Sequence, residues 1–122
     1  MRVELDAGAS AASEARAALT ALQDKVDGGV LEDLRLLVSE LVSNSVRHSG
    51  ASPGAKVVLA ITAAGESVRV EVTDAGGGFE PRPRTRDQSK GSGWGLHLVD
   101  RIAHRWGVDG RDRTRVWFEI DR

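Results

Sequence analysis

Apolar residues recur along the chain at two different spacings, one typical of helices and one typical of strands. Val3 and Leu5 share one parity, which predicts a short opening strand. Ser10 is the expected N-cap of a first helix, which continues until Asp27-Gly28-Gly29 stops it. The apolar stripe of this helix consists of Ala15, Ala18, Leu19, Leu22 and Val26. A strand and a helix are therefore predicted before residue 27.

A second helix is predicted from Val30 to about Ser49-Gly50, before the helix-breaking pair Pro53-Gly54. Its apolar positions are Leu31, Leu34, Leu37, Val38, Leu41 and Val42. Four polar side chains also recur at helical spacing, namely Glu40, Asn44, Arg47 and His48. A polar stripe of this kind is more often solvated than functional, so its meaning depends on the rest of the chain.

Two runs of branched residues predict an antiparallel hairpin. Residues 57–61 form the first run, and Ala64-Gly65 is the turn signal. In residues 68–72, valines alternate with Arg69 and Glu71. This period of two indicates a sheet with one buried and one wet face, so helices are expected to cover only one side.

Residues 74–93 lose all periodicity, and a loop of this length is usually functional or disordered. A third helix is predicted to begin at Gly93 or Gly95. Trp106 is expected on its apolar side, and Gly107 is expected to end it. Two closing strands follow, with Val108, Val116, Phe118 and Ile120 as their apolar positions. Three aromatic residues are predicted to lie in the core, namely Trp106, Trp117 and Phe118.

This order of elements predicts an α+β fold, a two-layer sandwich of one mostly antiparallel sheet covered on one face by three helices. The chain has 122 residues, of which 40% are hydrophobic, and it shows no internal repeat. Residues 1–122 are therefore expected to form a single domain around one core.

Composition narrows the classes of function. A net charge of −1 provides no basic field for nucleic acid. Cysteine is absent, which excludes disulfides and thiolate metal sites. No apolar run approaches the ~18 residues of a membrane span, and the first six residues lack the build of a signal peptide. We therefore expect a cytoplasmic protein that binds neither nucleic acid nor membrane.

Four common motifs give no support to a function. The sequence lacks G-x-x-x-x-G-K-[ST], and its G-x-S-x-G match at residues 50–54 lies between a predicted helix and the following strand, not in the strand-to-helix turn of a nucleophile elbow. Residues 91–96 do not form G-x-G-x-x-G, because Leu96 stands where the third glycine belongs. His48, His97 and His104 are scattered and lack H-E-x-x-H spacing. P-loop, dinucleotide-binding, serine-hydrolase and zinc-protease functions are therefore poorly supported.

Three other segments point to one kind of site. Asp74 follows a predicted strand and precedes three glycines, so it can accept a hydrogen bond from an exocyclic amine while a flat ring lies against the backbone. Glycines before the third helix let N–H groups converge on phosphate oxygens. On the second helix, Asn44 can give a neutral oxygen to Mg²⁺. Glu40, one turn earlier, can orient or deprotonate a hydroxyl or a water.

Residues 40–48, 74–79 and 93–96 resemble the N, G1 and G2 boxes of the GHKL ATPase superfamily, in the same order and at similar spacing. Within that superfamily, residues 37–48 and the ending 105–120 resemble the small anti-sigma-factor serine/threonine kinases. The resemblance covers nearly the whole chain. It implies a histidine kinase-like, Bergerat-type ATP-binding fold with ATP and Mg²⁺ as cofactors.

The resemblance also implies roles for single residues. Glu40 becomes the catalytic base or water-orienting acid, Asn44 the Mg²⁺ ligand, and Asp74 the acceptor of the adenine amine. The rest of the implied nucleotide site consists of Gly76 and Gly78 beside the base, Gly93 and Gly95 near the phosphates, Leu96 behind them, and Thr114 by the adenine pocket. A flexible ATP lid is implied at about residues 76–92. Two of its cations are candidates for phosphate contact, Arg86 and Lys90.

Two functions remain open on this basis. One is a regulatory kinase that phosphorylates a serine or threonine of an anti-sigma-factor antagonist and sequesters a sigma factor in the opposing state. The other is a non-catalytic ATP-binding interaction module. A sensor histidine kinase domain is a third, disfavoured interpretation, because no phosphoacceptor helix is expected ahead of this domain. The implied partners are the antagonist or sigma factor and a second copy of the chain, whereas Arg47 and His48 are interpreted as structural.

Overall fold

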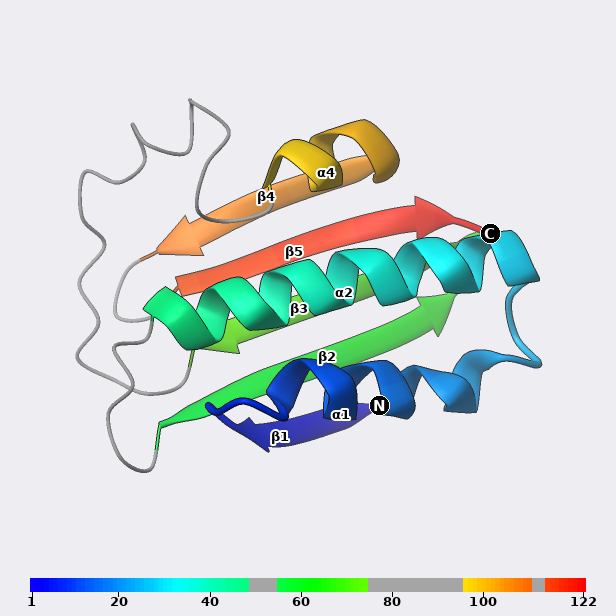
Figure 1. Ribbon diagram of the computed structural model, residues 1–122. Helices are drawn as coiled ribbons and strands as arrows, with labels where there is room; N and C mark the ends of the chain where they lie inside the picture. Colours follow the sequence, from blue (N-terminus) through cyan, green and yellow to red (C-terminus); the bar gives the residue numbers. More distant parts are fainter. Residues whose placement is uncertain (49–54, 75–95, 111–113) are drawn as a thin grey trace.

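Five antiparallel strands form one layer, and the helices lie against one face of it (Figure 1). The computed structural model describes residues 1–48, 55–74, 96–110 and 114–122. The strands, in the sheet order β1-β2-β3-β5-β4, are β1 (Arg2–Asp6), β2 (Lys56–Ala64), β3 (Ser67–Asp74), β5 (Thr114–Asp121) and β4 (Arg105–Gly110). The described helices are α1 (Ala11–Ala18), the 3₁₀ helix η1 (Leu19–Leu22), α2 (Gly28–His48) and α4 (Leu96–Ile102). The predicted α+β sandwich is confirmed.

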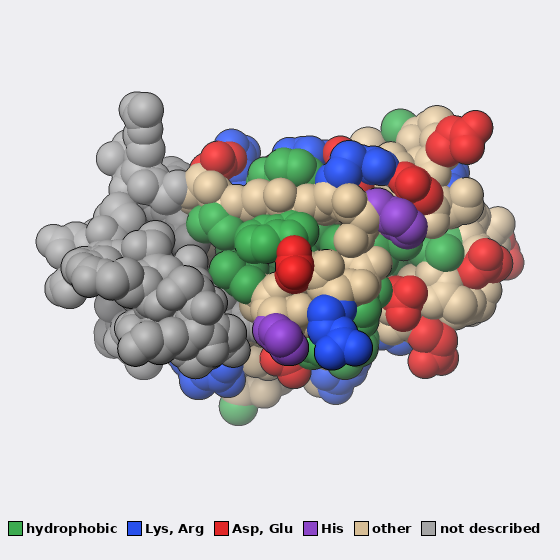
Figure 2. All heavy atoms as spheres, turned by 90° about the horizontal axis from the view of Figure 1, so that it is seen from above, with side chains coloured by type: hydrophobic (Ala, Val, Ile, Leu, Met, Phe, Trp, Pro, Cys, Tyr) green, Lys and Arg blue, Asp and Glu red, His purple; other side chains and the backbone are tan. Residues whose placement is uncertain are grey.

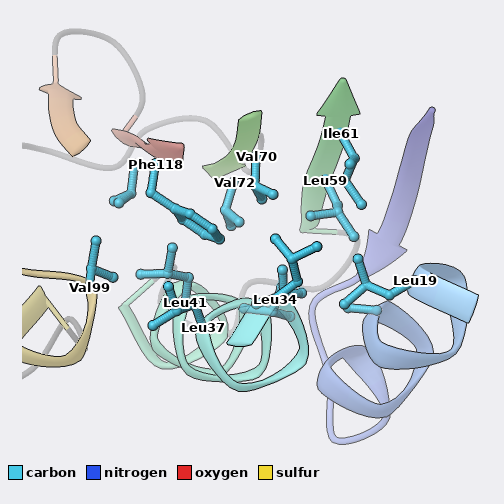
Figure 3. Packing of buried hydrophobic residues seen from close by; sticks show 14 of the residues in the cluster. Leu19, Leu34, Leu37, Leu41, Leu59, Ile61, Val70, Val72, Val99 and Phe118 are labelled. Carbon is cyan, nitrogen blue, oxygen red and sulfur yellow. The ribbon is translucent and has the colours of Figure 1, made fainter. Parts of the chain in front are cut away.

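The core lies between the sheet and the helices. Alternate residues of each strand face it, and the antiparallel register sets Leu59 opposite Val72 and Val70 opposite Phe118. Figure 3 shows these side chains above the leucines of α2, with Val99 of α4 and Leu19 of η1 on either side. The predicted hairpin of β2 and β3 is confirmed, and it is longer at both ends than the apolar runs alone indicate.

Both predicted helix boundaries near residue 27 were inaccurate. The first helix ends as η1 at Leu22, so Val26 lies beyond it and packs against the core from the following turn. The second begins at Gly28 instead of Val30. Asp27 explains this start, since its Oδ1 accepts a hydrogen bond from the N–H of Val30 at 2.9 Å and so caps the first turn. The two glycines are therefore part of the helix.

The third predicted helix was too long. It ends at Ile102, and Trp106 and Gly107 belong to β4. Trp106 pairs with Phe118 in the sheet register and packs against the core, as expected of an apolar residue there. In the sequence, Gly107 resembles a glycine that ends a helix. In the structure, Trp117 on β5 explains why a residue without a side chain stands here. A Cβ at this position would lie 2.7 Å from Nε1 of Trp117.

The sheet face away from the helices carries charged side chains instead of a second core. Arg69 forms salt bridges with Glu71 and Glu119, with N–O distances of 2.9 and 3.1 Å. Arg105 forms salt bridges with Glu119 and Asp121, with N–O distances of 2.6 and 2.5 Å. The ring of Trp117 lies on this face beneath Arg69, whose guanidinium carbon is 4.2 Å from the ring centroid. The placement of Trp117 in the core was therefore wrong, because residue 117 has the opposite parity to Val116 and Phe118.

Charges of both signs alternate on the surface around α4 and β4 (Figure 2). This view shows no large area of one sign among the described residues. Within the described part of the chain, none of the helices is long and apolar enough to cross a membrane.

We predict that Gly107→Ala destabilises the fold by about 1–3 kcal/mol, because the added methyl group forces the Trp117 ring or the strand to move. Urea unfolding followed by circular dichroism measures the change. Gly8→Ala is the matched control, since a Cβ at Gly8 meets nothing within 4 Å. Equal stability of the two variants would contradict the prediction, because the Trp117 ring would then move aside at no cost in free energy.

We also predict that Arg105→Gln flattens the dependence of stability on acid pH. Arg105, and then Arg69, holds the pKa of Glu119 below its ordinary 4.5, and Arg105 lowers the pKa of Asp121 below 3.8. Carboxylates with lowered pKa values stabilise the fold above their unfolded pKa, and this contribution disappears as the pH falls through the folded pKa. The variant should therefore be less stable than the wild type at pH 7 but close to it near pH 2.

The measurement is urea unfolding of both proteins across this pH range. Arg101→Gln, at an exposed arginine of α4, is the control for loss of one positive charge. If the free energy of unfolding of Arg105→Gln differed from that of the wild type by the same amount at every pH, Arg105 would not be the cause of the lowered pKa values of Glu119 and Asp121.

Candidate functional site

The polar residues of α2 do not form one exposed stripe. Leu34, Leu37 and Leu41 are buried, and the same helix face continues into Asn44 and Ser45, which are 1% and 4% exposed. Glu40 is half-buried, and Arg47 is exposed. The core-facing side of the helix thus becomes polar in its last turns, so the predicted polar stripe is partly buried.

Asp74 lies on the opposite layer. It is the last residue of β3 and has the same parity as Val68, Val70 and Val72, so its side chain faces the helices. It is 2% exposed and stands opposite Val57 of β2 in the register. A carboxylate buried at a strand end is costly unless a polar group satisfies it.

The chain brings three of the predicted segments to one end of the molecule. In Figure 1, α2 and β3 both end on that side, and the first turn of α4 is directed toward it. Leu96, the first residue of α4, is buried in the core cluster, which agrees with a packing role. Glu40, Asn44, Asp74 and Leu96 therefore belong to elements that meet around one end of the two layers.

Other predicted site residues lie outside the described part of the chain. These are Gly76, Gly78, Gly93 and Gly95, together with the lid at residues 76–92 and its cations Arg86 and Lys90. Thr114 is the first residue of β5 and stands opposite Gly110 of β4. The nucleotide-binding roles of these glycines, of the lid and its cations, and of Thr114 stay predictions.

Arg47 was interpreted as structural, but it contacts the proposed metal ligand. Its Nη2 donates a hydrogen bond to Oδ1 of Asn44. A guanidinium can only donate, so this contact fixes which end of the amide is the oxygen. The spacing of three residues on one helix was the available signal, since such pairs are neighbours on the helix surface. Ser45 was also missed, because nothing in its type indicates burial.

Neighbouring helices hold this part of α2 in place. Nη1 of Arg16 in α1 donates to Oγ of Ser39 at 2.7 Å, one residue before Glu40. Val99 of α4 packs beside Leu41 on the other flank (Figure 3). The backbone that carries Glu40 and Asn44 is therefore held between two other helices and the sheet.

The donors on these elements suit a metal that arrives with phosphate. In the described residues, no three His, Cys, Asp or Glu side chains lie together as a metal site would require. One neutral amide oxygen is a poor site by itself, but Mg²⁺ commonly takes one or two protein ligands and completes its shell with phosphate and water. Asn44 therefore fits Mg²⁺ bound with a nucleotide and does not fit a resident protein-held ion.

Comparisons with known proteins identify the family and agree with the fold. A model of the histidine kinase-like ATPase domain matches residues 5–120. A search of curated proteins gave no match. Among solved structures, the crystal structure of the RsbU and RsbW domains of Rv1364c from Mycobacterium tuberculosis has a similar fold, with a TM-score of 0.77 and 23% sequence identity.

That alignment covers 99% of this chain and 31% of the other, so the present chain spans about a third of the length of its structural neighbour. At this identity the likeness concerns the fold, while the family model extends over nearly the whole sequence. The chain belongs to the histidine kinase-like ATPase domain family.

Proposed function

We propose that this chain is an ATP- and Mg²⁺-dependent regulatory protein kinase that phosphorylates a serine or threonine on an anti-sigma-factor antagonist. One observation carries the proposal: a buried carboxylate, Asp74, and a buried amide, Asn44, lie on facing layers near the ends of β3 and α2, which are on the same side of the molecule in Figure 1. The family match supplies ATP as the expected nucleotide.

In this proposal Asp74 recognises the base. A buried carboxylate that faces the helix layer accepts a hydrogen bond from the exocyclic amine of adenine. Guanine presents an oxygen at the equivalent ring position, which would face the carboxylate with a second acceptor. Asp74 therefore selects adenine over guanine nucleotides, while Leu96 forms an apolar wall where α4 starts.

Asn44 and Glu40 act at the phosphate end. Asn44 holds Mg²⁺ through its amide oxygen, and the metal would neutralise charge on the phosphates. Glu40 lies one helical turn before Asn44 and is half-buried, so it reaches the boundary between the layers and solvent. There its carboxylate orients the substrate hydroxyl and takes its proton as the phosphoryl group is transferred.

The proposed protein partner is supported by two similarities. The similar structure from Mycobacterium tuberculosis contains an RsbW domain, and the sequence resembles small anti-sigma-factor kinases over residues 37–48 and 105–120. We infer an antagonist protein as the phosphate acceptor and a sigma factor as the protein sequestered in the opposing state.

Asp74→Asn is predicted to weaken ATP binding by roughly 10- to 100-fold, because an amide NH₂ would face the adenine amine and a buried polar group would lose its partner. Isothermal titration calorimetry with ATP and Mg²⁺ measures the affinity. Asp109→Asn, on the sheet face away from the helices, is the control. If Asp74→Asn binds as tightly as the wild type while remaining folded, the base-recognition role is wrong.

Glu40→Gln is predicted to reduce phosphoryl transfer about 10²- to 10⁴-fold while ATP affinity stays near the wild-type value. The assay uses labelled ATP, Mg²⁺ and antagonist proteins encoded near this protein's gene. Glu32→Gln, at an exposed acid two turns earlier on α2, is the matched control. A wild-type protein that binds ATP but transfers phosphate to none of these antagonists would favour the non-catalytic interaction module.

A further inference from the structure

We propose that Arg47 is a built-in competitor of the metal, a cation that holds the amide oxygen of Asn44 in the ligand-free protein and must leave when Mg²⁺ binds. The proposal rests on the proposed function, because it takes Asn44 as the magnesium ligand. It adds a residue that sets how strongly nucleotide binding depends on Mg²⁺.

The need for such a cation follows from burial. Asn44 is 1% exposed, so water cannot readily satisfy its oxygen when no ligand is present. Arg47 lies three residues later on the same helix, and its Nη2 donates to that oxygen. The guanidinium therefore stabilises a polar atom that would otherwise be costly to bury.

The same contact opposes the metal. Mg²⁺ and a guanidinium are both cations, and each seeks the one carbonyl oxygen of Asn44. If both approached it from the boundary of the site, two positive charges would lie within a few ångströms in a partly buried environment, where repulsion is poorly screened. Binding of one therefore excludes close contact by the other.

The structure also indicates which partner moves. Asn44 is fixed in the interface between α2 and the sheet, next to Leu41 and Ser45. Arg47 is exposed and can swing into water without desolvation. The exchange therefore consists of Arg47 releasing Asn44, while the amide keeps its orientation and presents its oxygen to the metal.

Two measurable consequences follow. Removal of the guanidinium should make Mg²⁺ effective at lower concentration, because the metal no longer displaces a cation. It should also destabilise the ligand-free protein, because the buried oxygen of Asn44 loses its donor. A purely structural arginine would produce the second effect without the first.

The test measures ATP affinity by calorimetry over a series of free Mg²⁺ concentrations, from chelator-treated buffer upward. The quantity compared is the Mg²⁺ concentration at which the gain in ATP affinity is half-maximal. Arg47→Met keeps most of the side-chain stem and removes both charge and donor, whereas Arg47→Gln keeps a neutral donor. We expect both variants to lower this concentration roughly fivefold or more, a typical size for coupling between two ligands.

Arg47→Lys keeps the charge and should stay closer to the wild type, and it provides a folded variant should Arg47→Met unfold. Arg35→Met, elsewhere on α2, controls for loss of a positive charge from this helix. Thermal melting without ligand gives the independent readout, with Arg47→Met expected to melt below Arg35→Met.

An unchanged or raised half-maximal Mg²⁺ concentration in Arg47→Met and Arg47→Gln overturns the proposal, because Arg47 then does not compete with the metal. This failure differs from failure of the proposed function. If the wild type bound no ATP at any Mg²⁺ concentration, the nucleotide site itself would be wrong, and the role of Arg47 would be overturned with it.

Discussion

The rest of the structure depends on the packing of α2 along the middle of the sheet. Leu34, Leu37 and Leu41 each bury a side chain there, and full burial of one leucine stabilises by about 1.5–3 kcal/mol. The helix runs without a break to His48, so the next positions on the same face, Asn44 and Ser45, enter the interface whether or not they are apolar. The leucines outweigh the cost of burying one amide, about 1–3 kcal/mol when it lacks a partner. A polar group is thus held rigidly inside the fold by its apolar neighbours.

Local patterns predicted most of the fold, and the errors have different causes. The presence of the β2–β3 hairpin and of α2 was correct, although not all their bounds, because nearby residues determine them through alternation in one case and 3.6-residue spacing in the other. Gly107 was misread as a helix stop because glycine is favoured there, yet its small size is required by Trp117 on the next strand. This requirement comes from a contact between two paired strands, which the local pattern around Gly107 does not reveal. The parity of Trp117, in contrast, was available from Val116 and Phe118 and was overlooked.

For the site, the sequence identified residue types but not their environments. Asn44 and Asp74 were predicted from a resemblance and from the chemistry of amides and carboxylates, and both prove to be buried at the layer interface. Arg47 was interpreted as structural, because the resemblance gave roles on this helix only to Glu40 and Asn44. Its importance depends on the burial of Asn44, which converts an ordinary surface contact into the satisfaction of an enclosed oxygen. Burial is a property of the assembled layers, so the polar stripe alone could not reveal it.

The two faces of the sheet are coupled through strand register. Side chains alternate between faces with a period of two, so a slip of β3 by one residue would turn Asp74 away from α2 and toward solvent. On the outer face, Arg69 of β3 stands opposite Glu119 of β5 and bonds to it, and Glu119 also bonds Arg105 of β4. These ion pairs are partly or fully exposed to solvent and individually weak, but they match only in the observed register. The charged face therefore favours the one alignment of β3 that keeps the Asp74 carboxylate buried against the helix layer.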